Sequence, residues 1–353
     1  MTVKKVVGIC FDQMHIGDLL EIAQKSKDYQ VVGVYDPTNE RMIPVCDDLE
    51  IPHKLMYTDW QQMLEETQPD LGIVCSVTDD HTLWTQRLAE RGIHILLEKP
   101  FSTSTADAEE AIRVANQHKV HLCVNWPLAW YDTHRTTKAM IDAGEIGEVT
   151  EVHYYDGNRG PLYHLHGKKE VTETPDPNET WWYSKAAGGG SLLDYLGYGV
   201  TIGTWFRDGE MPEEVTAVSH IPAGYEVDEQ SIVIARYPAG LSSFQTRWGT
   251  FTDPWVTQPQ PFCGFVVVGT QGTIMSRDYA THVQVQTSAH PEVRELAVHD
   301  FGEQRDIFEY LNRVIDDGGK VEGPCGAHYS LLGQKFVDAA KQSAETRQPV
   351  RLK

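Results

Sequence analysis

The sequence predicts an α/β protein built from two domains. Its 353 residues exceed what one hydrophobic core usually organises. Over residues 1–125, apolar runs alternate regularly with amphipathic segments, which is typical of a doubly wound parallel sheet with right-handed crossovers. Between residues 214 and 286 the apolar period changes to two, which predicts mainly antiparallel strands. We therefore expect a first domain over residues 1–125 and an α+β domain over residues 126–353, whose last helix can pack back on the first domain.

The first domain should alternate strands and helices along its whole length. Each predicted strand is an apolar run, and each predicted helix places apolar residues on one face. Ser102, Thr103 and Ser104 offer caps for the last of these helices. The predicted strands span residues 3–10, 29–35, 53–57, 71–76, 93–97 and 120–125. The predicted helices span residues 17–27, 40–49, 59–67, 81–91 and 103–118.

Asp36 marks a candidate cofactor site at the end of the second predicted strand. Dinucleotide-binding folds place an acid there, roughly 20 residues past the first turn, to bind the adenosine ribose hydroxyls. A carboxylate in this place favours NAD and repels the extra phosphate of NADP, although Arg41 follows and could soften that preference. The alternative interpretation of Asp36 is a turn residue before Pro37.

The phosphate-binding loop departs from the G-x-G-x-x-G pattern of a Rossmann domain. Phe11, Gln13 and Ile16 stand at the three glycine positions, and Gly8 precedes the loop. Without those glycines the backbone cannot approach a pyrophosphate in the usual way. Either the cofactor binds along a displaced or side-chain-lined loop, or the domain no longer binds one. We favour the first alternative, in which the cofactor contacts Phe11, Asp12, Gln13, Met14 and His15.

The fifth predicted strand ends in the stretch Glu98-Lys99-Pro100. Ligands of open α/β sheets lie beyond the carboxyl ends of the strands, where the Lys99 ammonium could polarise an oxygen and stabilise developing negative charge. Glu98 could tune Lys99 as its ion-pair partner. The alternative is a charged pair on the surface before a helix. The residues that follow other strand ends should also line the cofactor side, namely Ser76, Thr78, His81 and Asn125.

The second domain should begin with a strand at residues 149–155 and continue through an irregular stretch over residues 156–187. A long loop rich in aromatics and histidines is usually functional or an interaction arm. Gly188-Gly189-Gly190 then opens a helix to Phe206, on which Asp194 and Tyr198 share one face. The predicted strands span residues 215–220, 230–237, 240–247, 263–269, 272–277 and 282–287, with a hairpin turn at 269–272. The closing helices span residues 303–317 and 328–346.

Aromatic and histidine side chains of this domain are candidate substrate contacts. Indole rings stack on the C–H face of a sugar, and their alternative role is core or subunit packing. His164 and His166 are two apart but have no evident third partner, so we expect no metal site. The candidates are Trp126, Tyr163, His164, Trp181 and Trp182.

Charge, hydrophobicity and cysteine content indicate which binding partners and which cellular location the protein should have. The net charge of −21 argues against nucleic acid and anionic membrane surfaces. The first residues run straight into a strand, so no signal peptide is expected, and no apolar run reaches the length of a membrane span. The six cysteines are scattered without a C-x-x-C pair, which fits a reducing cytoplasm.

The ordered set of motifs resembles the Gfo/Idh/MocA family, named for glucose–fructose oxidoreductase and inositol dehydrogenase. The resemblance covers nearly the whole chain. It is carried by the segments at residues 78–81 (TDDH, with Asp79 where the family usually has proline), 98–100 (EKP), 144–148 (GEIGE), 188–194 (GGGSLLD) and 334–340 (QKFVDAA).

The resemblance implies a Rossmann domain followed by a domain with a large open sheet that commonly forms an oligomer interface. It implies NAD-dependent hydride transfer at a secondary alcohol or ketone of a sugar, glycoside or cyclitol, by a homodimer or homotetramer. Lys99 would support the reacting oxygen, and Asp194 would contact substrate or tune the base. Tyr198 stands where many members have histidine, and could transfer the proton if Lys99 lowers its pKa; its alternative role is a buried helix aromatic. Two alternative functions are an NAD-retaining enzyme that cleaves glycosides and a non-catalytic sensor.

Overall fold

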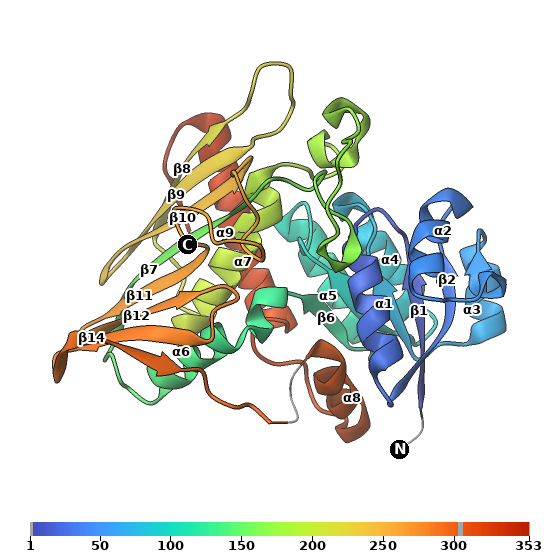
Figure 1. The fold of residues 1–353 in the computed structure, drawn as a ribbon, viewed down its shortest axis with the longest axis horizontal. Helices are drawn as coiled ribbons and strands as arrows, with labels where there is room; N and C mark the ends of the chain where they lie inside the picture. The colour runs from blue at the N-terminus through green and yellow to red at the C-terminus, as the bar shows by residue number, and fades with distance from the viewer. Residues whose placement is uncertain (1–2, 303–305, 353) are drawn as a thin grey trace. The chain divides into compact units, whose positions relative to one another are not determined.

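The chain folds into two compact units in the computed structural model, which describes residues 3–302 and 306–352 (Figure 1). The first unit comprises the described residues of Met1–Asn125, Leu162–Pro177 and Glu303–Ala327. The second comprises those of Trp126–Pro161, Asn178–Gly302 and His328–Lys353. The α/β class predicted from the sequence is confirmed.

A six-stranded parallel sheet forms the centre of the first unit, in the order β3-β2-β1-β4-β5-β6. This is the order of a doubly wound dinucleotide-binding sheet. The strands are β1 (Lys4–Ile9), β2 (Tyr29–Tyr35), β3 (Met56–Tyr57), β4 (Leu71–Val74), β5 (His94–Glu98) and β6 (Leu122–Asn125). The helices are α1 (His15–Lys25), α2 (Asn39–Asp48), α3 (Trp60–Thr67), α4 (His81–Ala89), α5 (Thr105–His118) and α8 (Ile307–Asp317).

Local chemistry explains where these elements lie. The strands β4, β5 and β6 are almost wholly buried because a parallel sheet is covered on both faces. Asp59 caps α3 and Ser104 caps α5, each by accepting backbone N–H groups of the first turn. The capping role expected in the stretch 102–104 therefore falls to Ser104.

The second unit is built on a nine-stranded sheet in the order β14-β13-β12-β11-β7-β10-β9-β8-β15. All neighbours are antiparallel except β7 and β10, which run parallel. Its strands are β7 (Val149–Asn158), β8 (Glu214–His220), β9 (Gln230–Tyr237), β10 (Gly240–Trp248), β11 (Gly264–Gly269), β12 (Gly272–Arg277), β13 (His282–Thr287), β14 (His290–Ala297) and β15 (Val350–Arg351).

Helices cover one face of this sheet, namely α6 (Asp132–Asp142), α7 (Ser191–Phe206) and α9 (Ala327–Thr346) (Figure 1). Almost every residue of α7 is buried. A Cβ on Gly199 would lie 2.3 Å from the Tyr154 ring of β7, so glycine is what lets the helix approach the sheet. The opposite face exposes alternate apolar side chains of β8, β9 and β10, namely Val218, Ile232, Ile234 and Leu241.

Several predicted boundaries need correction. The stretch from residue 156 was expected to be irregular, but β7 continues through Asn158 because it pairs with β10 there. The second-domain helix begins at Ser191 rather than at residue 188, since Gly190 has a φ of 104°. The sequence does not predict β14 or β15. The predicted helix at 303–317 starts outside the described residues, and α8 is described from Ile307.

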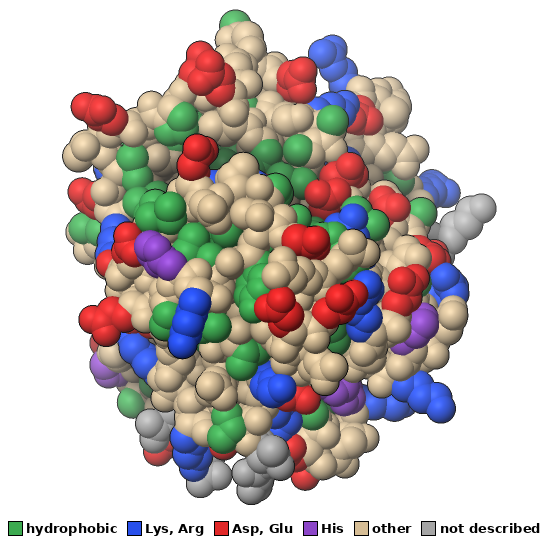
Figure 2. All heavy atoms as spheres, turned by 90° about the vertical axis from the view of Figure 1, so that its right-hand side faces the viewer, with side chains coloured by type: hydrophobic (Ala, Val, Ile, Leu, Met, Phe, Trp, Pro, Cys, Tyr) green, Lys and Arg blue, Asp and Glu red, His purple; other side chains and the backbone are tan. Residues whose placement is uncertain are grey.

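Although the chain is acidic overall, its acidic and basic side chains are mixed on the surface. On the face shown in Figure 2, acidic and basic side chains are interspersed rather than gathered into fields of one sign. Among residues 3–302 and 306–352, none of the helices combines the length and the hydrophobicity that crossing a bilayer requires.

Candidate active site

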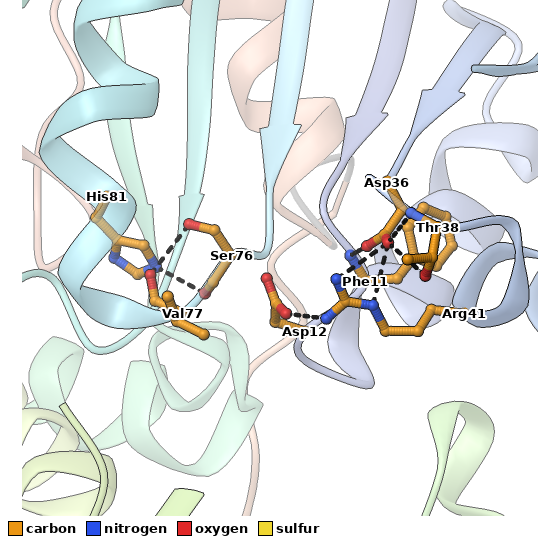
Figure 3. Close-up of polar contacts among 8 residues, drawn as sticks. All are labelled: Phe11, Asp12, Asp36, Thr38, Arg41, Ser76, Val77 and His81. Atoms are coloured by element: carbon orange, nitrogen blue, oxygen red, sulfur yellow. Dashed lines mark hydrogen bonds and ion pairs between the residues drawn. The ribbon is translucent and has the colours of Figure 1, made fainter. Parts of the chain in front are cut away.

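The carboxyl edge of the six-stranded sheet gathers most of the predicted cofactor residues. Parallel strands end at the same edge, and the segments after β1, β2, β4 and β5 all contribute polar side chains there. Asp36 follows β2 and its side chain is completely buried. Its Oδ2 accepts the Phe11 backbone N–H at 2.9 Å, and its Oδ1 accepts the Thr38 N–H at 3.0 Å (Figure 3). The acid thus joins the first loop to the second strand.

Arg41 completes this corner of the site. Its Nε lies 3.1 Å and its Nη2 3.0 Å from Asp36 Oδ1, while its Nη1 donates to Asp12 Oδ1 (Figure 3). Burial favours the neutral form of Arg41, but Asp12 and Asp36 outweigh it and raise the pKa of the guanidinium. Burial also raises the pKa of Asp12, against the opposing effect of Arg41. One cation therefore bridges two carboxylates.

The loop after β1 is lined by side chains where a Rossmann loop has glycines. Cys10 adopts a φ of 63°, which turns the chain at the strand end. Phe11, Gln13 and Ile16 are all buried. The Gln13 Nε2 donates to the Lys99 carbonyl at 3.1 Å, and its Oε1 is buried without a hydrogen-bond partner among the described residues. Side chains of this loop thus reach across the sheet edge to β5.

Gly17, which follows the loop in the first turn of α1, allows a close packing contact. A Cβ at this position would lie 2.5 Å from the His166 side chain. His166 belongs to Leu162–Pro177, and its Nε2 lies 2.7 Å from Asp48 Oδ2. The Gly167 N–H donates to Asp18 Oδ1 at 2.6 Å. Part of the stretch predicted to be irregular is therefore a segment held on α1 and the end of α2.

Glu98 and Lys99 lie at the end of β5 and are both almost fully buried. Glu98 Oε1 lies 2.9 Å from His15 Nδ1, and Glu98 Oε2 accepts Asn125 Nδ2–H at 2.7 Å. Burial alone would raise the pKa of Glu98, but His15, Lys99 and Asn125 outweigh it and lower that pKa. Likewise Glu98 overcomes the effect of burial and raises the pKa of His15. A buried anion thus stands beside Lys99.

His81, Ser76 and Thr78 surround the turn after β4. His81 begins α4, and its Nδ1 lies 3.2 Å from the Phe101 carbonyl oxygen. Its Nε2 lies 3.3 Å from the Ser76 carbonyl oxygen (Figure 3). Burial lowers the pKa of His81 despite these carbonyls. All three side chains are buried. His81 therefore fastens the turn after β4 to the chain that follows Lys99.

The second unit holds Asp194 and Tyr198 on the buried helix α7. Asp194 Oδ2 accepts the Trp248 Nε1–H at 3.1 Å. The Tyr198 ring packs edge-on against Trp126, with ring centroids 5.5 Å apart. Trp126 is itself buried and donates its Nε1–H to Ser330 Oγ at 3.1 Å. The predicted pair does lie on one helix, close to two indole rings.

The remaining predicted substrate residues fall into both units. Trp181 and Trp182 stack at 3.9 Å in the second unit, and Trp182 packs against Trp248. Tyr163 is exposed and His164 is buried, both in the segment grouped with the first unit. Sequence reasoning missed Trp248, because only the β10 register brings it to a residue 54 positions earlier.

The first unit provides the features that a dinucleotide needs. Asp36 stands where the ribose acid belongs, and α1 begins directly after the loop, so its N-terminal N–H groups lie at the sheet edge. The buried Gln13 Oε1 offers an acceptor among the described residues. These residues fit a nicotinamide dinucleotide bound along a side-chain-lined loop. Among the described residues, no group of three or more His, Cys, Asp or Glu side chains is placed to hold a metal ion.

Sheet order and the acid after its second strand define a dinucleotide-binding protein of the Rossmann class. The chain belongs to the GFO/IDH/MocA oxidoreductase family. Residues 5–126 match the family model described as an oxidoreductase family with an NAD-binding Rossmann fold, and residues 134–275 match the model of the GFO/IDH/MocA C-terminal domain. The predicted family and its NAD cofactor are thereby confirmed.

Similar proteins span several chemistries. The chain is 25% identical over 56% of its length to 2,7-anhydro-N-acetylneuraminate hydratase of Mediterraneibacter gnavus, of which it covers 48%. It is 26% identical over 65% of its length to 1,5-anhydro-D-fructose reductase of Ensifer adhaerens, of which it covers 63%. The chain spans about half the length of the first curated relatives it matches, between 45% and 58%.

Solved structures share the fold over the whole chain. An oxidoreductase from Agrobacterium radiobacter in complex with NAD+, L-tartaric acid and magnesium superposes with a TM-score of 0.78. The match covers 99% of this chain and 98% of that one at 17% identity, which establishes a common fold.

Proposed function

We propose that the protein is an NAD-dependent oxidoreductase that transfers a hydride between the nicotinamide and a secondary hydroxyl or keto group of a sugar, glycoside or cyclitol. The observation that carries the proposal is Lys99, an almost fully buried cation at the carboxyl end of β5. A buried lysine at the ligand-binding edge of an α/β sheet has a chemical use, since its charge is weakly screened there.

The residues of the first unit take defined roles in this proposal. Asp36 binds the adenosine ribose hydroxyls while Arg41 stays paired with it. The loop from Phe11 to His15 lines the pyrophosphate, while Ser76, Thr78, His81 and Asn125 line the cofactor side of the edge. NAD, when bound, supplies the acceptor or donor of the hydride. Lys99 holds the substrate oxygen while negative charge develops on it, and the Glu98 anion keeps Lys99 positioned.

The second unit supplies the substrate side of the proposal. Tyr198 transfers the hydroxyl proton, and Asp194, fixed by Trp248, orients the substrate. Trp126, Trp181 and Trp182 of this unit are proposed contacts to the substrate's C–H faces and hydroxyls. Tyr163 and His164, which belong to the segment grouped with the first unit, are proposed as further contacts. The sugar assignment is supported by relatives named for anhydro-sugar chemistry.

Two further properties belong to the proposal. We infer a homodimer or homotetramer formed through the exposed apolar face of β8, β9 and β10. We also infer a reducing, cytoplasmic location, since all six cysteines are free and buried.

The test begins with the purified chain. Its absorption spectrum reports nicotinamide that remains bound, and calorimetric titration with NAD and NADP reports affinity for each. A panel of sugars, glycosides and cyclitols is then screened for reduction of added or retained NAD. Tighter binding of NAD and turnover of at least one polyol are expected; failure to bind either dinucleotide would refute the proposal.

A second candidate is transient oxidation coupled to elimination or hydration, with NAD retained. The similarity to a hydratase of a 2,7-anhydro sugar favours it, as does the side-chain-lined loop, which suits a cofactor that stays bound. Product analysis separates the candidates, because only the second releases an aglycone or adds water without net reduction of NAD. Bound NAD with no turnover of any polyol would instead favour a sensor.

A further inference from the structure

We propose that Asp12 is a specificity-determining residue of the cofactor site: it holds Arg41 against Asp36 and so keeps the guanidinium from binding the 2′-phosphate of NADP. This inference rests on the proposed function, since it concerns which dinucleotide the same site accepts. It goes beyond the ribose acid Asp36, because it assigns the discrimination to the residue that engages the neighbouring cation.

Arg41 lies where an arginine would otherwise favour NADP. It stands in the first turn of α2, directly after the strand end that carries Asp36. In Rossmann sites an arginine at this corner accommodates the 2′-phosphate. Here the guanidinium is already engaged, by Nε and Nη2 with Asp36 and by Nη1 with Asp12 (Figure 3). Within the described residues, these two acids are the ion-pair partners of Arg41.

The charge of the cluster opposes a phosphate. One guanidinium against two carboxylates leaves a net charge of about −1, and a 2′-phosphate adds further negative charge at short range. Asp12 is only 14% exposed and Asp36 is fully buried, so solvent screens this repulsion weakly. A ribose with two hydroxyls has no such charge, and its hydroxyls can donate to the acids.

Asp12 and Asp36 are not equivalent members of the cluster. Asp36 is held by the Phe11 and Thr38 N–H groups whether or not Arg41 is present. Asp12 also has a hydrogen bond with the Val77 backbone, in the turn after β4. Removing the Asp12 charge therefore leaves the ribose acid in place and releases Nη1 of Arg41. The released group can then donate to a 2′-phosphate, to which arginine binds by charge-assisted hydrogen bonds.

The test measures binding rather than turnover. Calorimetric titrations with NAD and with NADP are run on the unmodified full chain and on Asp12→Asn, which keeps the side-chain shape and removes the charge. NADP affinity should rise roughly tenfold or more, the size of one charge-assisted hydrogen bond, and the NADP-to-NAD affinity ratio should rise with it. Asp12→Ser repeats the measurement should the asparagine variant fail to fold, as judged by thermal unfolding.

Two further variants separate this mechanism from a general charge effect. Asp79→Asn removes an exposed acid from the segment after β4, and should leave the affinity ratio within about twofold. Asp12→Asn combined with Arg41→Met should lose the gain in NADP affinity, because the gain is expected to act through Arg41. Retention of the gain in the double variant, or an equal gain in Asp79→Asn, would overturn the assignment.

The outcomes also distinguish this inference from the function on which it rests. If the unmodified protein binds NAD and Asp12→Asn gains no NADP affinity, the role of Asp12 is wrong and the proposed function stands. Stronger binding of NADP than NAD by the unmodified protein would likewise overturn it. If neither dinucleotide binds any variant, the proposed function and the inference both fall.

Discussion

Replacing His15 by glutamine should destabilise the first unit in a pH-dependent way. His15 Nδ1 lies 2.9 Å from Glu98, whose side chain is completely buried and whose other oxygen is held by Asn125 at 2.7 Å. Glutamine keeps a neutral N–H donor at position 15 but not the positive charge. The expected loss is the difference between a charged and a neutral hydrogen bond, roughly 1 to 1.5 kcal/mol.

The direction of the pH dependence follows from the pKa shifts of His15 and Glu98. The pKa of His15 is raised, so its contribution to stability is complete below the ordinary histidine pKa of 6.5 and is lost as pH rises through the higher folded-state pKa. The pKa of Glu98 is lowered, so its contribution is present above 4.5 and is lost as pH falls through the lower folded-state pKa. The cost of His15→Gln should therefore be largest between about pH 5 and pH 6.5.

Scanning calorimetry at pH 6 and pH 9 measures this cost. At pH 6 the melting temperature of His15→Gln should fall by about 2–4 °C per kcal/mol, and the deficit should shrink at pH 9. His53→Gln is the matched control, because His53 pairs with Asp47 at 2.7 Å but both side chains are more than half exposed. Its cost should stay within about 0.5 kcal/mol at either pH. An equal deficit for His15→Gln at both pH values would refute the charge argument.

Three other predictions address the second unit and the packing of α1. Tyr198→Phe should lower turnover and remove the tyrosine limb from the pH profile, whereas Asp194→Asn should raise KM more than the dissociation constant of NAD; unchanged kinetics in both would exclude them from the site. Light scattering at micromolar concentration should show a dimer or tetramer that Ile232→Asp disrupts, and a monomeric unmodified chain would contradict the sheet interface. Gly17→Ala should cost about 1–3 kcal/mol in denaturant unfolding, since the new Cβ would meet His166 at 2.5 Å; an unchanged midpoint would contradict that packing.

The strands of the first sheet could be predicted because they are buried on both faces and are therefore apolar runs in the sequence. The hairpin turn at residues 269–272 was also predicted from the sequence, and β11 and β12 pair across it. The strand β14 gives no such signal, because most of its residues are exposed and Pro291 interrupts the pattern. The end of β7 carries Asp156 and Gly157, which disfavour strands, and is held by the register of β10.

Among the site residues, too, those marked by a local sequence pattern could be predicted, whereas those that depend on tertiary contacts could not. Asp36 and Lys99 could be located because each directly follows an apolar strand. The ion pair between Arg41 and Asp12 could not be predicted, since it depends on how the loop turns at Cys10. The contact of Trp248 with Asp194 depends on a strand register that no local pattern encodes.

Replacing Lys99 by methionine isolates the effect of the buried positive charge on turnover. Methionine is an unbranched side chain only one atom shorter than lysine and carries no charge, so NAD binding and folding should be largely retained. Turnover of a polyol that the unmodified protein oxidises should fall on the order of a hundredfold or more, as for loss of a fixed group that stabilises the transition state. Lys54→Met, an exposed lysine of the same unit, should turn over normally. Near-normal turnover by Lys99→Met with bound NAD would contradict the account.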